Sequence, residues 1–546
     1  MPKAATPTSQ PAPDALRLAF AQLQRENVRL HAENAELKAQ NAEFHAQRAW
    51  LVEQMRRANQ RLYAPSSERA PAGQGALLFN EAEALADPKA LEPEIETIQY
   101  PRKKRKVAGQ RALDLADFPV VETVHELSEE QRVCPDCRGS LHEMGEDIQT
   151  KIDIVPASVR VLRRIRKKYA CRHCQLHALH TPVVAAPVPE TAFPNSLASS
   201  GAVAHILCQK YAEGMPLYRQ EAALKRLGCH LPRQTLANWM LVGAGWLDTL
   251  LARLVHHLKR RDIACADETE MQVLKEPGRA AETKSFMWLY RSGRDGPEIA
   301  VFDYQPTRAA QHPKAFLAGY QGYLQVDGYV GYEALPGVTL VGCWAHARRK
   351  FVEALKTLPK ETREKGGTPV HAGLAFCDAL FRIERSLQEA TPEERLAARK
   401  ERSAAVLAKC KAWLDAMAGQ VLPKSLLGAA VTYCRNQWEK LTAFLLDGRL
   451  EIDNNRSERT IKPFVIGRKN WLFANTPKGA RASATIYSVV ETAKANGLNP
   501  LPYLTYLFET LPNIDCRSDK AIDALLPWSP DIQERFRIPE RKLMPN

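Results

Sequence analysis

DIACADETEMQVL, residues 262–274, opens the stretch of sequence that decides the fold, and its apolar run leads into Asp267. Further pieces follow in chain order: two strand-like runs that end in turn residues, a short helical segment, a fourth apolar run that ends at Asp327, and a fifth that enters a basic helix. They read KSFMWLYRSGRDG (284–296), EIAVFDYQPTRAA (298–310), RAAQHPKAFLAG (308–319), GYLQVDGYVGYEAL (322–335) and VTLVGCWAHARRKFVEAL (338–355).

Three hairpin-like strands, a crossover helix and another strand are the order of a ribonuclease-H-like core. In such a core the first and fourth strands are neighbours, so we expect the carboxylates of Asp267 and Asp327 to meet. Two unpaired carboxylates raise each other's pKa, and a divalent cation such as Mg²⁺, which prefers oxygen ligands, offsets that cost. Two such ions about 3.5–4 Å apart activate a water or a 3′-hydroxyl in phosphodiester chemistry. The sequence therefore predicts two Mg²⁺ or Mn²⁺ ions and phosphoryl transfer.

A third carboxylate is expected to complete this metal site, and Glu458 in EIDNNRSERTIKPFVIGRKNWLF (451–473) is the candidate. Asp and Asn side chains cap helix starts, so Asp453-Asn454-Asn455 predicts a helix from about Arg456 with Glu458 in its first turn. Strand alternation turns Glu268 away from Asp267. The alternatives for the third carboxylate are Asp453, Glu491, Glu268 and Glu270, and the alternative for the two aspartates is that they are only turn residues.

Several motifs in this order resemble the transposases of the insertion-sequence 66 family, over nearly the whole chain. They are LYAPSSER, two CxxC pairs, ADET, DGYVGY, CWAHARRKF, DNNRSERTIKPFVIGRKNWLF and ETAKANGLNPLPYL. The resemblance implies a DDE transposase, and it also implies two small accessory proteins from the same mobile element.

Bulk composition narrows the class of protein. The chain has 546 residues, more than one domain usually holds. Its net charge of +14 and pI of about 9.2 favour a polyanionic partner, here double-stranded DNA. No apolar run of about 18 residues and no export signal occur, so we expect no membrane contact and a cytoplasmic protein. The resemblance implies that this protein is bacterial and nucleoid-associated. Of the 12 cysteines, four form CxxC pairs, which indicates metal binding rather than disulfides.

A heptad repeat is predicted over residues 14–63, after a disordered Pro-rich start at 1–13. Apolar residues at one seam position over six heptads predict a coiled coil, and three Asn residues at the other seam position favour two strands in a fixed register. We therefore expect a homodimer or higher oligomer; the alternative is one long helix packed on its own domain. The first seam consists of Leu16, Leu23, Leu30, Leu37, Phe44 and Leu51.

A zinc-binding module is predicted over residues 126–190. It follows an acidic linker, 64–125, which contains the basic run PRKKRKV. The resemblance to bacterial transposases favours DNA contact or simple solvation of this run over nuclear import. Four thiolates are the set that structural Zn²⁺ takes, here Cys134, Cys137, Cys171 and Cys174, with His142, His173, His177 and His180 as possible replacements. A basic hairpin between the CxxC pairs is expected to contact the DNA backbone through Arg163, Arg164, Arg166, Lys167 and Lys168.

Residues 191–261 predict a helical DNA-binding domain of three helices, with breaks at 214–216 and 228–232. The last two helices have the short connection of a helix-turn-helix; the alternative is a plain bundle. The second of them would begin with the DNA-reading residues Arg233, Gln234 and Asn238.

The catalytic core is predicted in two parts, 262–351 and 451–512, separated by a helical insertion at 352–450 that lacks strand alternation. Trp344 is predicted to stack on an unpaired base, with burial in the core as the alternative, and 513–546 to form a poorly ordered tail. Phosphate contacts are expected from His346, Arg348, Arg349, Arg459, Lys462, Arg468 and Lys469.

The predicted fold class is thus a multidomain α+β and α/β chain: coiled coil, zinc module, helical DNA-binding domain and an interrupted ribonuclease-H-like core. The predicted function is that of a DDE transposase, which cuts the 3′ ends of a mobile element and joins them to target DNA. Two alternatives stay open, a DNA-binding regulator without catalysis and a structure-specific nuclease with the same core.

Overall fold

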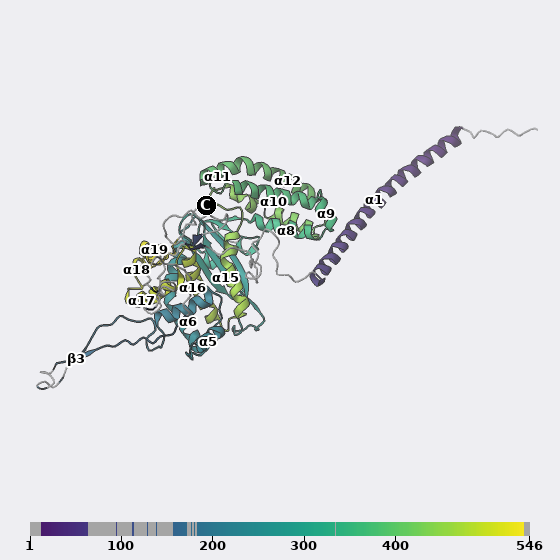
Figure 1. Ribbon diagram of the computed structural model, residues 1–546. Helices are drawn as coiled ribbons and strands as arrows, with labels where there is room; N and C mark the ends of the chain where they lie inside the picture. The colour runs from purple at the N-terminus through teal and green to yellow at the C-terminus, as the bar shows by residue number, and fades with distance from the viewer. Residues whose placement is uncertain are drawn as a thin grey trace, which may run out of the picture. The chain divides into compact units, whose positions relative to one another are not determined.

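The structure is a computed structural model, shown in Figure 1. It describes residues 13–63, 94–95, 112–113, 128, 138, 157–171, 176, 180, 183–333 and 335–539. The chain forms two compact units: the first holds residues 188–222 and 231–536 together with the N-terminal helix, and the second holds residues 66–187 and 223–230. No described helix combines the length and the apolar composition needed to span a bilayer.

A five-stranded mixed sheet lies at the centre of the first unit, with the strand order β7-β6-β5-β8-β9. The first and fourth strands of the sheet are neighbours, as predicted, and run parallel, with Ile263 opposite Tyr323 and Cys265 opposite Gln325. The crossover between β7 and β8 is the short helix α7 (Gln311–Phe316). The strands are β5 (Ile263–Gln272), β6 (Lys284–Ser292), β7 (Ala300–Gln305), β8 (Gly322–Gln325) and β9 (Val338–Val341).

One edge of this sheet is covered by the helix α16 (Pro477–Ala495). The backbone N–H groups of Ala300 and Phe302 on the edge strand β7 donate to the hydroxyls of Thr492 and Ser488, at 3.0 and 2.8 Å. Free strand edges invite pairing with other chains. The hydroxyls on α16 therefore accept hydrogen bonds from N–H groups that edge strand β7 would otherwise leave unpaired.

The three helices predicted over 191–261 are present, but they do not stand apart from the core. They are α4 (Ser200–Tyr211), α5 (Leu217–Arg226) and α6 (Arg233–Lys259). The Tyr211 hydroxyl lies 3.0 Å from that of Ser483 on α16. Phe193 packs edge-on against Phe508 of α17 (Pro500–Thr510), with ring centroids 5.3 Å apart. The helical segments directly before the sheet and those after it, α16 and α17, thus share one core.

The predicted poorly ordered tail is wrong for the residues described up to 539. Two short helices, α18 (Asp519–Asp523) and α19 (Pro530–Phe536), follow α17. Ile522 and Ile532 on them are buried, and Arg253 of α6 donates to Asp523 with two nitrogens, at 2.7 and 2.8 Å. Apolar burial and a bidentate ion pair fix this segment, although its sequence lacks a long periodic pattern.

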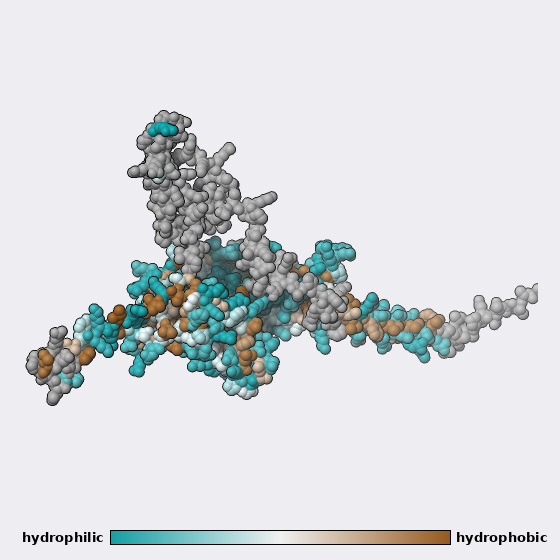
Figure 2. Space-filling model, turned by 60° about the horizontal axis from the view of Figure 1, so that its bottom comes forward, coloured by the Kyte–Doolittle hydropathy of each residue, from teal (hydrophilic) through white to brown (hydrophobic). Residues whose placement is uncertain are grey.

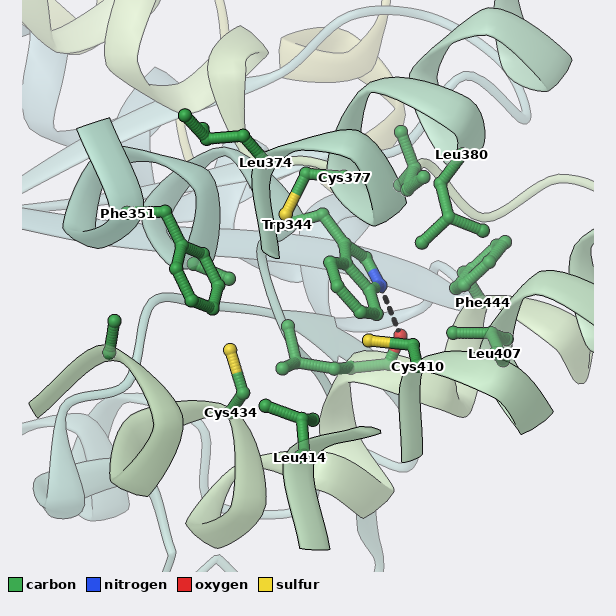
Figure 3. Packing of buried hydrophobic residues seen from close by; sticks show 14 of the residues in the cluster. Trp344, Phe351, Leu374, Cys377, Leu380, Leu407, Cys410, Leu414, Cys434 and Phe444 are labelled. Carbon is green, nitrogen blue, oxygen red and sulfur yellow. Dashed lines mark hydrogen bonds between the residues drawn. The ribbon is translucent and has the colours of Figure 1, made fainter. Parts of the chain in front are cut away.

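The described residues between 352 and 450 are helical, as predicted, and share a hydrophobic core with the sheet through Ile263 and Val341. Figure 3 shows Trp344 at the centre of this core, among Phe351, Leu380 and Phe444. The elements are α8 (Trp344–Lys356), α9 (Lys360–Lys365), α10 (Pro369–Ser386), α11 (Pro392–Ala398), the π-helical turn η3 (Arg399–Ser403), α12 (Ala404–Ala418), α13 (Leu426–Asn436), α14 (Trp438–Thr442) and the 3₁₀ turn η4 (Ala443–Leu445).

The N-terminal heptad segment is one helix, α1 (Pro13–Tyr63), which ends before Pro65 as expected. Three seam side chains, Leu23, Leu30 and Leu37, are 68%, 47% and 51% exposed in the single chain. Figure 2 shows apolar and polar patches next to each other along this helix. An apolar seam that faces solvent has no partner within the described chain.

The second unit contains two small described sheets. Strands β1 (Glu94–Ile95) and β2 (Ala112–Leu113) pair in parallel, and β3 (Lys168–Ala170) pairs antiparallel with β4 (Val183–Ala185). Among the described residues, the basic strand β3 thus pairs with β4, which follows the second CxxC pair. Residues 148–156 and 172–174 of the predicted hairpin lie outside the described residues.

Candidate active site

The two predicted aspartates lie side by side, Asp267 in the middle of β5 and Asp327 two residues beyond the end of β8. Cys265 of β5 is paired with Gln325 of β8, and Asp267 and Asp327 each come two residues later. Asp267 Oδ1 accepts a 2.9 Å hydrogen bond from the backbone N–H of Glu268, and Asp327 Oδ1 accepts one of 2.9 Å from that of Tyr329. The register of the sheet and these local bonds bring the two carboxylates together.

Negative charge is concentrated around Asp267. Burial, followed by the charges of Glu268, Asp327 and Glu458, raises the pKa of Asp267 to about 8. Three carboxylates from separate parts of the sequence therefore act on one half-buried acid. A cation bound among them would offset this repulsion.

Glu268, the residue after Asp267 on β5, has partners of its own. Its side chain accepts hydrogen bonds from Arg308 Nε at 2.8 Å and from the Tyr332 hydroxyl at 2.7 Å, and burial raises its pKa. Arg308 in turn lies over the ring of Tyr329, 4.0 Å from the centroid. Glu268 thus holds the DGYVGY segment against β5.

Glu458 lies in the first turn of helix α15 (Asn455–Trp471), as predicted. The predicted cap is formed by Asp453, which accepts from the backbone N–H of Asn455 at 3.0 Å. Asn454 does not cap with its side chain. Its amide instead donates to the carbonyl of Ala266 at 2.9 Å, and its Oδ1 accepts from Ser457 at 2.7 Å.

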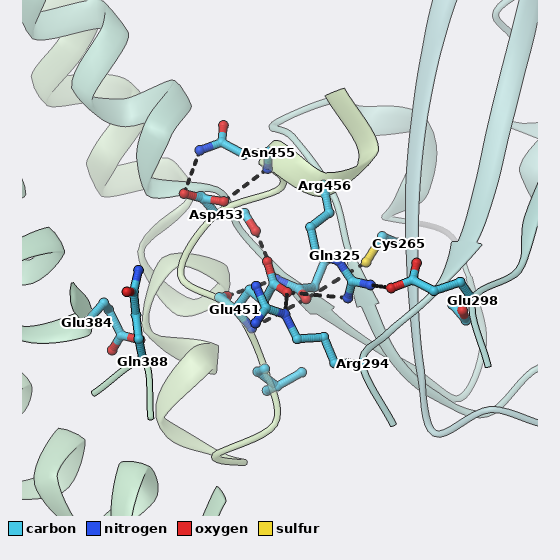
Figure 4. A network of polar contacts seen from close by, with 12 residues as sticks. Cys265, Arg294, Glu298, Gln325, Glu384, Gln388, Glu451, Asp453, Asn455 and Arg456 are labelled. Atoms are coloured by element: carbon cyan, nitrogen blue, oxygen red, sulfur yellow. Dashed lines mark hydrogen bonds and ion pairs between the residues drawn. The ribbon is translucent and has the colours of Figure 1, made fainter. Parts of the chain in front are cut away.

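The segment before α15 is also bonded to the second aspartate's strand. Gln325 Nε2 donates to the carbonyl of Glu451 at 2.8 Å, and the backbone N–H of Trp344 donates to the carbonyl of Ile452 at 3.0 Å. Figure 4 shows the polar network here, in which Arg294 reaches Glu451 at 2.6 Å. Together with the hydrogen bond from Asn454, these bonds hold the start of α15 near the strands of the two aspartates. Glu458 therefore lies near them although the helical insertion separates it from them in the sequence.

The carboxylate of Glu458 is turned toward α8. Arg349 Nη2 lies 3.2 and 3.3 Å from its two oxygens, and His346 Nδ1 lies 3.8 Å from Oε1. Burial and the charge of Arg349 lower the pKa of His346. Among the described residues, no three His, Cys, Asp or Glu side chains form a complete metal cage as they stand.

The alternative third carboxylates lie elsewhere or have other partners. Glu491 is buried on α16 and pairs with Lys494 at 2.9 Å. Glu270 pairs with Lys284 at 2.8 Å on an exposed part of β5. Asp453, which caps α15, is the nearest rival. Glu268 and Glu458 are the candidates whose charges raise the pKa of Asp267, and Glu268 is already bonded to Arg308 and Tyr332.

The base-stacking prediction for Trp344 is wrong. Its ring is fully buried, and its Nε1 donates to the carbonyl of Leu441 at 2.7 Å. Of the two arginines predicted to bind phosphate on α8, Arg348 donates to Asp378 at 2.7 Å and Arg349 to Glu458. Both guanidinium groups therefore already have carboxylate partners in this structure.

The other predicted DNA contacts are spread over both units. Arg459 and Lys469 are exposed on α15, Lys462 is partly exposed, and Arg468 donates to the hydroxyl of Thr269 at 3.3 Å. At the start of α6, Arg233, Gln234 and Asn238 are exposed. The predicted DNA contacts in the second unit are all exposed: Arg163, Arg164, Arg166, Lys167 and Lys168.

Of the four predicted zinc ligands, Cys171 is described and exposed. Cys134, Cys137 and Cys174 lie outside the described residues. The geometry of the zinc site is therefore outside the part of the chain that the structure describes.

Comparison with known protein families shows which family the chain belongs to. A family profile described as "Transposase IS66 family" matches residues 195–482, more than half of the sequence. The chain belongs to the IS66 transposase family. Three further IS66 profiles match, described as "zinc-finger binding domain of transposase IS66" (131–175), "IS66 C-terminal element" (488–528) and "Transposase C of IS166 homeodomain" (50–123).

Relatives in Sinorhizobium fredii are similar over most of their length. "Uncharacterized protein y4jD" is 32% identical over 417 residues, which cover 74% of this chain and 79% of that protein. "Uncharacterized protein y4qI" is 33% identical over 425 residues, 75% and 76% of the two chains. Family membership gives this IS66 chain a transposase role, DNA as partner, and domains that use zinc and divalent metal.

Two positioning residues of this IS66 site escaped the sequence analysis. Asn454 was assigned to the helix cap, and Gln325 was given no role. Both lie inside quoted motifs, yet their partners are backbone groups far away in the sequence. Only the folded arrangement identifies such partners.

Proposed function

We propose that this transposase cuts and joins DNA in a ribonuclease-H-like core, with Asp267, Asp327 and Glu458 as the catalytic carboxylates. The observation that carries the proposal is the convergence of Asp327 and Glu458 on half-buried Asp267, whose pKa they help to raise to about 8. The strand order, with β5 beside β8, supports the same core. A regulator without catalysis has no need of such a cluster.

The donor chemistry fits Mg²⁺ or Mn²⁺, since all three side chains offer carboxylate oxygens. Two such ions bound there would stabilise charge on the attacking and leaving oxygens of a phosphodiester. Asp267 and Asp327 are held by backbone N–H groups, and Asn454 orients the helix start that carries Glu458. The exposed residues Arg459 and Lys469 would hold phosphates beside the cluster.

Two reactions follow at this site in the proposal. Water first hydrolyses a phosphodiester at each 3′ end of the element, and the released 3′-hydroxyl then displaces a target-strand oxygen. Each step is an in-line displacement, so no covalent bond to the protein is needed. Arg349, which now pairs with Glu458, lies where it would also meet a phosphate.

The remaining parts are proposed to assemble and dock the enzyme. The exposed α1 seam would form a two-stranded coiled coil with a second copy. The zinc module with its basic strand, and the start of α6, would contact duplex DNA. Two accessory proteins of the element and nucleoid association remain part of the proposal, as do the domain limits at 64–125, 126–190 and 451–512.

The test is strand cleavage of DNA carrying the element's ends, with Mg²⁺ or Mn²⁺. Asp267→Asn, Asp327→Asn and Glu458→Gln should bind this DNA normally and cut it at least about 100-fold more slowly, the scale of one lost transition-state contact. Glu491→Gln, a buried carboxylate outside the cluster, is the matched control and should cut normally.

Different results would correct different parts of the proposal. Normal cutting by Asp327→Asn would overturn the mechanism. Normal cutting by Glu458→Gln with loss in Asp453→Asn or Glu491→Gln would move the third carboxylate only. Binding without any cleavage by the wild-type protein would favour a regulator, and cleavage without joining to a target would favour a nuclease.

A further inference from the structure

Helix α15 ends in an unusual turn at Trp471-Leu472-Phe473. Leu472 has φ 65° and ψ −50°, and the backbone N–H of Phe473 donates to the carbonyl of Trp471 at 2.8 Å. This is a γ-turn of the rare, strained kind. A leucine seldom occupies positive φ, so the surrounding structure must hold it there.

Both sides of this turn are anchored. The Trp471 ring packs edge-on against Phe464, with ring centroids 5.6 Å apart. The ring also lies close to Gly467, since a Cβ atom at that position would be 3.2 Å from Trp471 Nε1. On the other side, Ala474 donates to the carbonyl of Gln272 at 2.9 Å and accepts from the N–H of Leu274 at 3.0 Å. Strain at one residue persists when its neighbours are fixed in this way.

The two side chains at the tip of the turn face solvent. Leu472 is 63% exposed and Phe473 is 42% exposed. Single exposed apolar residues are ordinary, but here a large adjacent pair is presented at the cost of backbone strain. The turn thus holds two apolar side chains outward in a fixed position.

The sequence around the tip favours a polyanion. Residues 459–490 contain no Asp or Glu, and Lys469, Lys478 and Arg481 in this segment are exposed. A partner that suits this surface has negative charge on its outside, for the basic residues, and flat apolar groups in its interior, for the two apolar side chains. Duplex DNA has phosphates outside and stacked bases inside, and apolar wedges of other DNA-binding proteins enter between its base steps.

We propose that Leu472 and Phe473 form a wedge that inserts between the bases of the DNA substrate and unstacks one step. This inference rests on the proposed function, in which α15 lies along the DNA. Glu458 is at the other end of the same helix, about 21 Å away along its axis. The unstacked step therefore lies several base pairs from the bond that is cut, and the wedge fixes the register of the DNA on the enzyme.

The experiment uses the full chain and a duplex made from the end of its element, with 2-aminopurine moved through the duplex one position at a time. Unstacking raises the fluorescence of this base analogue. The wild-type protein should raise it at one step. The double variant Leu472→Gly, Phe473→Ser should abolish the rise and weaken binding roughly tenfold, the scale of one lost base contact.

Three further variants separate the wedge from folding effects. Leu472→Gly alone removes the side chain and relieves positive φ, so it should unfold at the same or a higher temperature and still weaken the signal. Phe473→Trp keeps a stacking ring and should retain the signal. Leu446→Ser removes a comparably exposed apolar side chain elsewhere and should behave as wild type.

Several outcomes would overturn the wedge. One is an unchanged fluorescence rise and unchanged affinity in the double variant. Another is a double variant that sediments differently from the wild type but unstacks DNA equally well. That result would mean that the two side chains contact another protein chain rather than DNA. A wild-type protein that cuts DNA without unstacking any step would refute the wedge and leave the proposed function intact. If Asp267→Asn unstacks DNA and still cuts it, the wedge stands and the catalytic proposal falls.

Discussion

The side-chain amide of Asn454 donates a 2.9 Å hydrogen bond to the carbonyl of Ala266, the residue directly before Asp267. Asn454 also begins α15, whose first turn carries Glu458. One buried side chain therefore connects the strand of the first catalytic candidate to the helix of the third. The distance between these two carboxylates depends on this bond more than on any local sequence preference.

Replacing Asn454 tests this connection. Asn454→Ala leaves the carbonyl of Ala266 and the hydroxyl of Ser457 without this partner, which should cost about 1–3 kcal/mol in the free energy of unfolding. Since Glu458 then loses its fixed position, kcat for cleavage should fall while the KM for DNA changes little. Asn455→Ala, whose side chain contacts Asp453 rather than the strand, is the control. Equal kcat in wild type and Asn454→Ala would refute the positioning role.

The α1 seam should hold the oligomer together. Changing Leu23, Leu30 and Leu37 to Ala removes three anchors, each worth about 2–5 kcal/mol when truncated in a packed core. Sedimentation should then show a smaller assembly. Val28→Ala, exposed but off both seams, should leave the assembly intact. An unchanged oligomer in the triple variant would place the interface elsewhere.

Zinc content can be measured directly. The purified chain should carry about one Zn²⁺ through its two CxxC pairs, the number that four thiolates bind. Metal analysis of Cys134→Ser with Cys171→Ser should show its loss, whereas Cys229→Ser should not change it. Undiminished zinc in the double variant would mean that other side chains are the ligands.

The ion pair between Arg253 and Asp523 predicts acid sensitivity of the C-terminal helices. Hydrogen bonds from Arg253 lower the pKa of Asp523 below its ordinary value. Its stabilising effect is therefore present above the ordinary Asp pKa and is lost as pH falls through the lowered value. Asp523→Asn should lower the free energy of unfolding by about 1–2 kcal/mol at pH 7, a value between the contributions of exposed and of buried ion pairs.

Thermal unfolding between neutral and strongly acidic pH checks this prediction. The difference between wild type and Asp523→Asn should shrink as pH falls. In an Arg253→Met background the same substitution should have a smaller effect, because His257 Nε2, 3.0 Å from Asp523 Oδ1, is then the remaining partner. A difference that stays constant with pH would show that the ion pair is not its source.

Much of this fold follows from local sequence signals. Strand runs closed by turn residues gave the five strands in order, and apolar periodicity gave the helices of the insertion and α1. The Asp453-Asn454-Asn455 start placed Glu458 in the first turn of α15. These signals suffice because side-chain alternation, helical period and capping depend on residues only a few positions apart.

Other features were decided by tertiary structure. Trp344 is buried because insertion helices close over it, and Arg349 pairs with Glu458 although 109 positions separate them. The described residues from 513 to 539 include α18, which is held because Arg253 of α6 donates to Asp523. In each case several chemically equivalent partners exist along the chain. The choice among them depends on which groups the packed core brings within hydrogen-bonding distance, and that information is spread over the whole sequence.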